Sequence, residues 1–339
     1  MPFLYDVRII DASTHITPIE YTRRLSTSKN KPARDAARTV IRLSERYRHF
    51  SDVNERLAAM DRYGYSSEVT MVHSIIEPNI FDFTSQEKFD LCQGLNSELS
   101  SLSRDSGRRL FALASVPLES PEMCENEMER SMKKLGLKGF MVPTNVMGKP
   151  LDSFEHFWSK AESLDATVYV HPVDPSGMEH RTYEREYDLA HVFGWPYETT
   201  LTLTRLALAG ILKRHPNLKV VAHHMGGMIP FFMGRIKESY SKAGSAVNDA
   251  GERLLGSSPQ EYLMKLYYDT AVGGSEPSLK CGLQTFGAER IIFATDFPWG
   301  PKGGIDRISS YPEHMYRLDL SAEELNRIFY VNVEKLILT

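Results

Sequence analysis

The sequence has 339 residues, of which 42% are hydrophobic and 25% charged, and its 40 basic and 44 acidic side chains leave a formal net charge of −4. This balance gives no reason to expect nucleic acid or an anionic membrane as a partner, and no apolar run approaches the roughly 20 residues needed to span a bilayer. Three scattered cysteines and an N-terminus without a basic, apolar leader are typical of a cytoplasmic protein with reduced thiols, which we expect to form one domain over residues 1–339.

Apolar runs of strand length alternate with helical patterns along the whole chain. The first strand lies within Ile9–Pro18, where apolar residues lead into polar ones and a proline ends the run. The next segment, Tyr21–Phe50, is polar and basic, and we expect a solvated insertion with one helix over about Lys31–Tyr47. The following helix, Ser51–Tyr63, has Gly64 directly after its end, as helices often do.

The later elements continue this alternation. We expect seven further strands, over Glu68–His73, Leu110–Val116, Lys138–Val142, Thr167–His171, Leu218–His223, Leu266–Thr270 and Ile291–Thr295. The expected helices are Ser85–Ser106, Ser120–Leu135, Asp152–Leu164, Pro196–Arg214, Met228–Ala243, Pro277–Phe286 and Ala322–Leu338. A polar loop, residues 172–188, directly follows the fifth strand. Loops longer than ~12–15 residues in compact domains are usually functional, so we expect it to act as a lid or to contact the substrate.

Eight strands alternating with helices, without a linker or a shift in composition, predict an α/β fold of the (β/α)8 TIM-barrel type with an insertion after the first strand. A doubly wound open sheet is the alternative. That fold would require a glycine-rich turn after the first strand, and the residues there, Ala12, Ser13 and Thr14, include no glycine.

Four of the expected strands end in side chains that commonly bind metal ions. These side chains are His15, His171, one of the pair His223 and His224, and Asp296. The carboxyl ends of parallel strands form the functional face of a barrel, so the four groups are expected to converge there. Imidazoles with one carboxylate fit catalytic zinc, and the subset His15, His171 and Asp296 also matches the two-histidine, one-carboxylate set of non-haem iron.

The sixth strand ends in two consecutive histidines. Because side chains alternate along a strand, we expect only one of them to face the site. His224 precedes Met225, Gly226 and Gly227, a turn that would expose it above the barrel, so we favour His224.

Several motifs resemble the amidohydrolase superfamily, in particular the branch of aminocarboxymuconate-semialdehyde, resorcylate and carboxyvanillate decarboxylases. The resemblance covers nearly the whole chain. Its markers are residues 10–18 around His15, Gly136–Phe140, Val170–Pro172, Gly194–Thr200, His215–Val221, His224–Phe231, Gly234–Arg235 and Ala294–Pro298.

The resemblance implies roles for these residues. His15, His171 and Asp296 would bind one divalent metal ion, with zinc expected and iron or manganese possible. His224 would be an additional ligand or an acid/base group, and Asp296 would share the catalytic role. Arg235 would face a substrate carboxylate or a neighbouring subunit, and Trp195 would shape the pocket, although packing at a helix start explains Trp195 equally well. The resemblance also implies a homo-oligomer, a dimer or a tetramer.

One residue departs from the family pattern. The first strand usually carries His or Glu at the position held here by Ser13, and serine is not a normal metal ligand. Water or substrate would then fill the gap, which makes Ser13 a candidate substrate contact. Asp11 could replace the missing ligand only if the strand slid or bulged.

We therefore expect a metal-dependent non-oxidative decarboxylase of a small aromatic or unsaturated carboxylic acid, in which Asp296 or His224 delivers a proton to the carbon that loses carbon dioxide. Three alternatives remain open. A hydrolase of an ester, lactone or amide would use the same ligands. The ligand set would also suit an iron- or manganese-dependent oxygenase subunit. Ser13 is the reason to consider a non-catalytic chain of a hetero-oligomer.

Overall fold

The computed structural model describes residues 7–174, 186–241 and 258–338. Its centre is formed by eight parallel strands in two hydrogen-bonded sets, ordered β1-β2-β3 and β10-β9-β8-β7-β4. The strands are β1 (Ile9–Ile16), β2 (Tyr65–Val72), β3 (Leu110–Ala112), β4 (Gly139–Pro143), β7 (Thr167–His171), β8 (Lys219–Ala222), β9 (Tyr267–Asp269) and β10 (Ile291–Ile292). A two-stranded antiparallel hairpin, β5 (Asn145–Val146) with β6 (Lys149–Pro150), follows β4.

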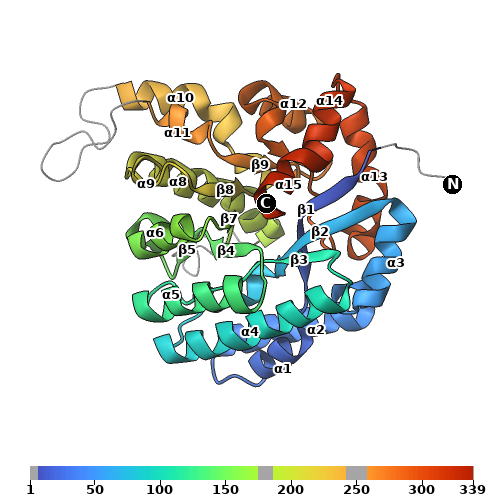
Figure 1. The fold of residues 1–339 in the computed structure, drawn as a ribbon, viewed down its shortest axis with the longest axis vertical. Coiled ribbons are helices and arrows are strands. Elements are labelled where there is room, and N and C mark those ends of the chain that lie inside the picture. The colour runs from blue at the N-terminus through green and yellow to red at the C-terminus, as the bar shows by residue number, and fades with distance from the viewer. Residues whose placement is uncertain (1–6, 175–185, 242–257, 339) are drawn as a thin grey trace, which may run out of the picture.

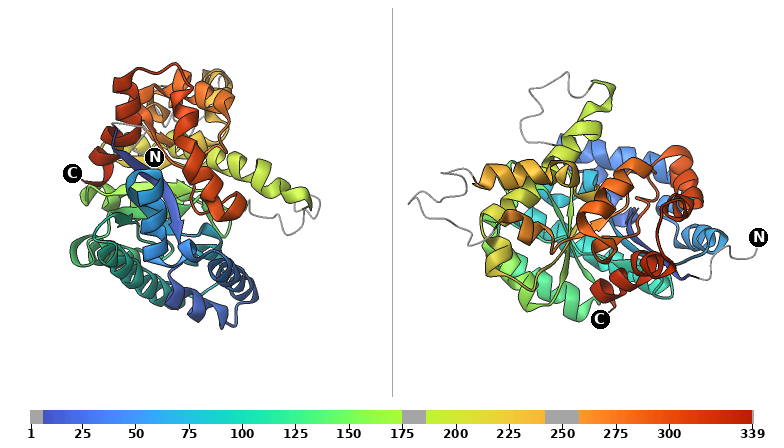
Figure 2. Two further views of the ribbon diagram at one scale, coloured as in Figure 1. Left: turned by 90° about the vertical axis from the view of Figure 1, so that its right-hand side faces the viewer. Right: turned by 90° about the horizontal axis from the view of Figure 1, so that it is seen from above.

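Backbone contacts between the edge strands of the two sets, β1 with β10 and β3 with β4, join the sets into a ring. The N–H of Ala12 donates to the carbonyl of Phe293 at 2.8 Å and links β1 to the end of β10. On the opposite side, a parallel bridge between Ala114 and Phe140 links the end of β3 to β4. These contacts close the expected (β/α)8 barrel, and Figure 2 shows its strands surrounded by helices when seen from above.

The helices pack around the strands (Figure 1). They are α1 (Ile19–Ser26), α2 (Lys31–Arg46), α3 (Val53–Tyr63), α4 (Ser85–Asp105), α5 (Pro121–Glu129), α6 (Glu155–Ser163), α8 (Trp195–Leu208), α9 (Ile211–Arg214), α10 (Ile229–Ser241), α11 (Pro259–Leu263), α12 (Glu276–Phe286), α13 (Ile305–Tyr316), α14 (Ala322–Asn326) and α15 (Asn332–Ile337). In the described part of the chain, no helix combines the length and apolar character needed to cross a membrane.

Several helical regions differ from the sequence prediction. The helix expected over Pro196–Arg214 is divided into α8 and α9, because Gly210 has a φ of 76° and ends the helical path. The insertion after β1 contains α1 as well as α2, because Tyr21 and Leu25 of α1 are buried in the core. Helix α13 was not expected; Pro312 lies within it, and an internal proline normally opposes a helix.

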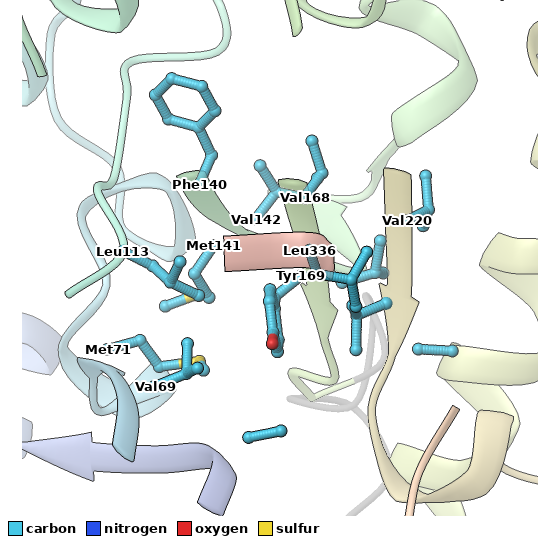
Figure 3. Packing of buried hydrophobic residues seen from close by; sticks show 14 of the residues in the cluster. Val69, Met71, Leu113, Phe140, Met141, Val142, Val168, Tyr169, Val220 and Leu336 are labelled. Carbon is cyan, nitrogen blue, oxygen red and sulfur yellow. The ribbon is translucent and has the colours of Figure 1, made fainter. Parts of the chain in front are cut away.

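Side chains of successive residues point to opposite sides of the strands, as strand geometry requires. Figure 3 shows Met141 and Tyr169 on one side of β4 and β7, and Phe140, Val142 and Val168 on the other. All five are fully buried. Packing on both faces explains why these strands read as continuous apolar runs in the sequence.

The loop expected over residues 172–188 lies largely outside the described residues, since the structure describes it only up to 174 and from 186. Its expected role as a lid therefore stays a prediction.

Candidate metal centre and active site

Three side chains from distant strands converge at the carboxyl end of the barrel. His15 lies in β1, His171 ends β7, and Asp296 lies just beyond β10. One potential donor atom from each lies within 4.8 Å of the other two. Nε2 of His15 is 3.2 Å from Oδ1 of Asp296, and the rings of His15 and His171 meet edge to face at 4.9 Å. Their spacing allows all three groups to contact one ion.

Hydrogen bonds orient two of these rings. Nδ1 of His15 lies 3.1 Å from the carbonyl oxygen of Val72, and Nδ1 of His171 lies 2.8 Å from that of Pro172. A carbonyl oxygen only accepts, so each Nδ1 carries the proton and each Nε2 keeps its lone pair. Nε2 of His15 is buried and has no hydrogen bond within the described structure. Such fixed tautomers, together with the unpaired Nε2 of His15, fit a metal site.

The protonation states also suit metal binding. Burial lowers the pKa of His171 well below its ordinary value, and the neighbouring His223 and His15 lower it further. Burial alone would raise the pKa of Asp296, but its favourable electrostatic contacts with His15, His224 and Arg307 outweigh burial and lower the pKa below the usual range. Neutral imidazole and ionised carboxylate are the forms that bind metals, so few protons compete at neutral pH.

Both histidines after β8 approach the site, so the expectation that only one would face it is wrong. The strand ends at Ala222, and His224 then has a φ of 54°, which breaks the alternation of a strand. Donor atoms of His171, His223 and His224 lie within 4.8 Å of one another. His223 is completely buried, whereas the His224 ring lines a cavity.

Asp269, the last residue of β9, contacts both His223 and His224. Its Oδ2 lies 3.0 Å from Nδ1 of His223, and its Oδ1 accepts the backbone N–H of His224 at 2.7 Å. The sequence analysis missed Asp269. Its signal was present, because Tyr267 and Tyr268 form a short strand that ends in this carboxylate, the same pattern that identified Asp296.

Ser13 and Asp11 occupy separate positions on β1. Oγ of Ser13 lies 2.9 Å from Nδ1 of His223. The pairing of β1 with β2 is irregular between Asp11 and Thr14, so the strand does bulge there. Asp11 nevertheless points to the last strand, where it accepts hydrogen bonds from the backbone and the hydroxyl of Thr295. Asp11 belongs to neither cluster of candidate metal donors.

A cavity of about 630 Å³ lies beside these groups. Its polar wall includes His224, Asp296 and Arg307, and among the described lining residues Arg307 is the one arginine or lysine. The apolar part of its wall includes Val192, Trp195, Met225, Phe231 and Val272.

Two predicted substrate contacts differ in position. Trp195 lines the cavity, packs edge-on against the His171 ring at 5.7 Å, and donates from Nε1 to Asp174 at 2.9 Å. Arg235 is exposed on α10, with its guanidinium over the Phe232 ring, and it is not one of the described residues that line the cavity. Contact between Arg235 and a neighbouring subunit stays a prediction.

A closed (β/α)8 barrel with a histidine and aspartate cluster at the carboxyl ends of its strands is typical of metal-dependent TIM-barrel enzymes. The particular family follows from comparison with known proteins. The amidohydrolase family model matches residues 10–337, and the chain therefore belongs to this family. The resemblance drawn from the sequence motifs is confirmed.

Named relatives extend the comparison. The chain is 32% identical over 216 residues to the 2-amino-3-carboxymuconate-6-semialdehyde decarboxylase of Dictyostelium discoideum, over 63% of this chain and 58% of that protein. It is 26% identical to the gamma-resorcylate decarboxylase of a Rhizobium species, over 72% and 76% of the two chains. The 5-carboxyvanillate decarboxylase of Novosphingobium aromaticivorans, solved with manganese and 4-hydroxy-3-methoxy-5-nitrobenzoic acid, superposes with a TM-score of 0.81 at 21% identity, over 98% of this chain and 96% of that one.

Proposed function

We propose that the protein is a metal-dependent non-oxidative decarboxylase of a small aromatic or unsaturated carboxylic acid. The observation that carries this proposal is the convergence of His15, His171 and Asp296 within 4.8 Å, beside a cavity that also contains Arg307. The named relatives support it, because both are decarboxylases of small unsaturated or aromatic acids. An arginine next to a candidate metal site suits a substrate that carries a carboxylate.

One divalent ion held by His15, His171 and Asp296 is part of this proposal. When bound, it would supply a Lewis acid that holds the substrate carboxylate and an adjacent oxygen. Zinc fits this donor set, and manganese is the ion named in the superposed carboxyvanillate decarboxylase. Iron also prefers two histidines and a carboxylate.

The chain's own groups would manage the proton. As the bond to the carboxyl group breaks, carbon dioxide leaves and the substrate carbon must gain one proton. The low pKa of Asp296 suits it to remain an ionised metal ligand. The His224 ring faces the cavity, so we assign to it delivery of the proton to carbon.

The cavity walls suit a flat substrate. Trp195 and Phe231 provide apolar surface for a ring or a conjugated chain, and Arg307 provides a positive charge close to Asp296. Ser13 is buried against His223, so it would act on the substrate only through that histidine.

The test is a turnover assay with metal-loaded protein. Gamma-resorcylate, 5-carboxyvanillate and 6-methylsalicylate are incubated with protein containing zinc, manganese or iron, and carbon dioxide release is measured. In heavy water the product is expected to gain one deuterium at the carbon that lost the carboxyl group. Cleavage of ester or lactone analogues without carbon dioxide release would instead indicate a hydrolase. Oxygen uptake by iron-loaded protein would indicate an oxygenase.

We also propose that the protein assembles with a second copy of itself. Val192, Phe193, Tyr197 and Phe231 are between 49% and 78% exposed, around the start of α8 and on α10. The segment at the start of α8 projects from the barrel (Figure 2). Apolar side chains gathered on a projecting segment are typical of an interface. Light scattering would measure the mass, and an assembly that forms only with a related chain would support the hetero-oligomer. A cytoplasmic location stays a prediction.

A further inference from the structure

One ring nitrogen of His223 lies close to two polar side chains, and the other has no hydrogen-bond partner within the described structure. Nδ1 lies 2.9 Å from Oγ of Ser13 and 3.0 Å from Oδ2 of Asp269. Nε2 is buried and has no hydrogen-bond partner within the described structure. Leaving a buried polar atom unpaired is energetically unfavourable, so an unpaired nitrogen in a cluster of metal-binding side chains indicates a missing ligand.

The partners of His223 determine which nitrogen is available. Oδ2 of Asp269 lies 3.0 Å from Nδ1 and has no hydrogen-bond partner within the described structure. A carboxylate oxygen can only accept, so we assign the proton to Nδ1, which leaves the lone pair of Nε2 free. A carboxylate behind a histidine whose other nitrogen binds metal is a recurrent arrangement, because it fixes the ring and increases its basicity. Oγ of Ser13 is a second acceptor for the same N–H and further limits rotation of the ring.

The two candidate donor clusters share His171. Nδ1 of His171 is bound to the carbonyl of Pro172, so only Nε2 is free, and one nitrogen lone pair binds one ion. His171 can therefore bind only one ion, so an ion held by His15, His171 and Asp296 is the ion that His223 could share.

We propose that Nε2 of His223 is a ligand of the metal ion, and that it replaces the ligand which β1 lacks at Ser13. This inference rests on the metal-dependent function proposed above. The ion would be bound by three imidazoles and one carboxylate, from His15, His171, His223 and Asp296. Ser13 becomes a positioning residue for the new ligand, and His224 remains free to transfer a proton.

The first test measures metal binding without turnover. Metal-free wild type, His223→Ala and His73→Ala are titrated with Zn²⁺ against a competing chelator. His73 is the matched control, because it is equally buried and stacks on His15 at 5.6 Å, yet lies outside both donor clusters. We expect the Kd to rise at least 10–100-fold in His223→Ala and to change less than about threefold in His73→Ala.

X-ray absorption of the zinc-loaded proteins counts the imidazole ligands directly. Three are expected in wild type and in His224→Ala, and two in His223→Ala. Wild-type protein with only two imidazoles would overturn the inference even if the His223 variant failed to fold. A His224→Ala variant that lost one imidazole would overturn it too, by assigning the third ligand to His224.

A second-site change tests the replacement itself. Ser13→Glu added to His223→Ala supplies a carboxylate from β1, and we expect it to recover at least tenfold in zinc affinity. No recovery would refute the idea that the two positions substitute for each other. Wild-type protein that binds no stoichiometric metal would refute the proposed function as well, whereas equal Kd values in wild type and His223→Ala would refute only the role of His223.

Discussion

The guanidinium of Arg307 donates a hydrogen bond to Oδ2 of Asp296 at 2.9 Å. The other oxygen of that carboxylate faces Nε2 of His15 at 3.2 Å, so Asp296 connects the candidate metal centre to the positive charge of α13. Arg307 is only partly exposed and lines the cavity. It can therefore orient Asp296 and attract a carboxylate substrate from the same position.

Replacing Arg307 by alanine is expected to raise KM for the substrate at least tenfold, since a charge-assisted contact is worth about 1.5–3 kcal/mol. Arg307→Lys keeps the charge but loses the planar fork, so its KM should fall between wild type and alanine. Steady-state kinetics measure both. Lys302→Ala is the control, because Lys302 lies in the preceding turn and pairs with Asp306 at the surface. Equal effects of the Arg307 and Lys302 changes would exclude a specific role for Arg307.

Replacing Asp296 by asparagine removes a charge from between His15 and Arg307. We expect turnover to fall by about 10²–10⁴-fold, because the metal ion would lose its only carboxylate ligand among the three proposed residues. Single-turnover rates with saturating metal separate a chemical defect from weak metal binding. The surface variant Asp306→Asn should behave as wild type. Turnover of Asp296→Asn within twofold of wild type would rule out the assigned role.

Much of the fold could be predicted because its signals are local. Thr167–His171 is an apolar run with the length of its strand. The helix expected over Ser51–Tyr63 is observed as α3, which begins two residues later and ends before Gly64 as expected. The division at Gly210 could not be predicted, because an amphipathic pattern runs through the glycine and only its φ of 76° ends the helix. The periodicity of apolar residues predicts which segments are helical, but it does not predict the backbone φ and ψ angles of a single residue such as Gly210.

The site divides in the same way. His15, His171 and Asp296 could be found because each ends a strand, and a barrel brings strand ends together. The approach of both His223 and His224 could not, because it depends on a left-handed turn after β8. Arg307 lies on a helix with no sequence signal that links it to the strands. Its position follows only from the way α13 packs against the barrel mouth.

A buried ion pair supports the strand that carries His15. Nε of Arg56 lies 2.5 Å from Oε2 of Glu68, both side chains are fully buried, and Nη1 of Arg56 donates to the carbonyl of His15 at 2.6 Å. Arg56→Met leaves the Glu68 charge buried without its partner, so we expect the free energy of unfolding to fall by about 3–5 kcal/mol. Urea unfolding of the metal-free protein measures this loss.

The pair can be separated from general disruption of the core. Adding Glu68→Gln to Arg56→Met removes the stranded charge, and the double variant should recover part of the lost stability. A double variant no more stable than Arg56→Met would show that the loss comes from packing rather than from charge. The pair of Arg48 with Asp52 serves as the reference, because Arg48 is exposed and removing it should lower the free energy of unfolding far less than Arg56→Met does.

Glu77 is expected to make stability depend on pH. Its carboxyl group is fully buried, and burial raises its pKa to about 7 even though the backbone and side-chain N–H groups of Asn79 stabilise the charge. In the unfolded chain a glutamate has a pKa of about 4.3. Between these two values the folded protein binds more protons than the unfolded chain, so this group makes stability fall as pH rises from about 4 to 7 and then level off.

Both the size of the fall in unfolding free energy between about pH 4 and 7 and its assignment to Glu77 can be measured. The difference between these two pKa values corresponds to roughly 4 kcal/mol at most, since one pKa unit is about 1.4 kcal/mol. Urea unfolding of metal-free protein at several pH values should show the decline in wild type and in the exposed control Glu122→Gln, but not in Glu77→Gln. The slope is the quantity to compare, because glutamine cannot accept from both Asn79 donors and lowers stability at every pH. If Glu77→Gln kept the wild-type slope, another group would have to carry the pH dependence.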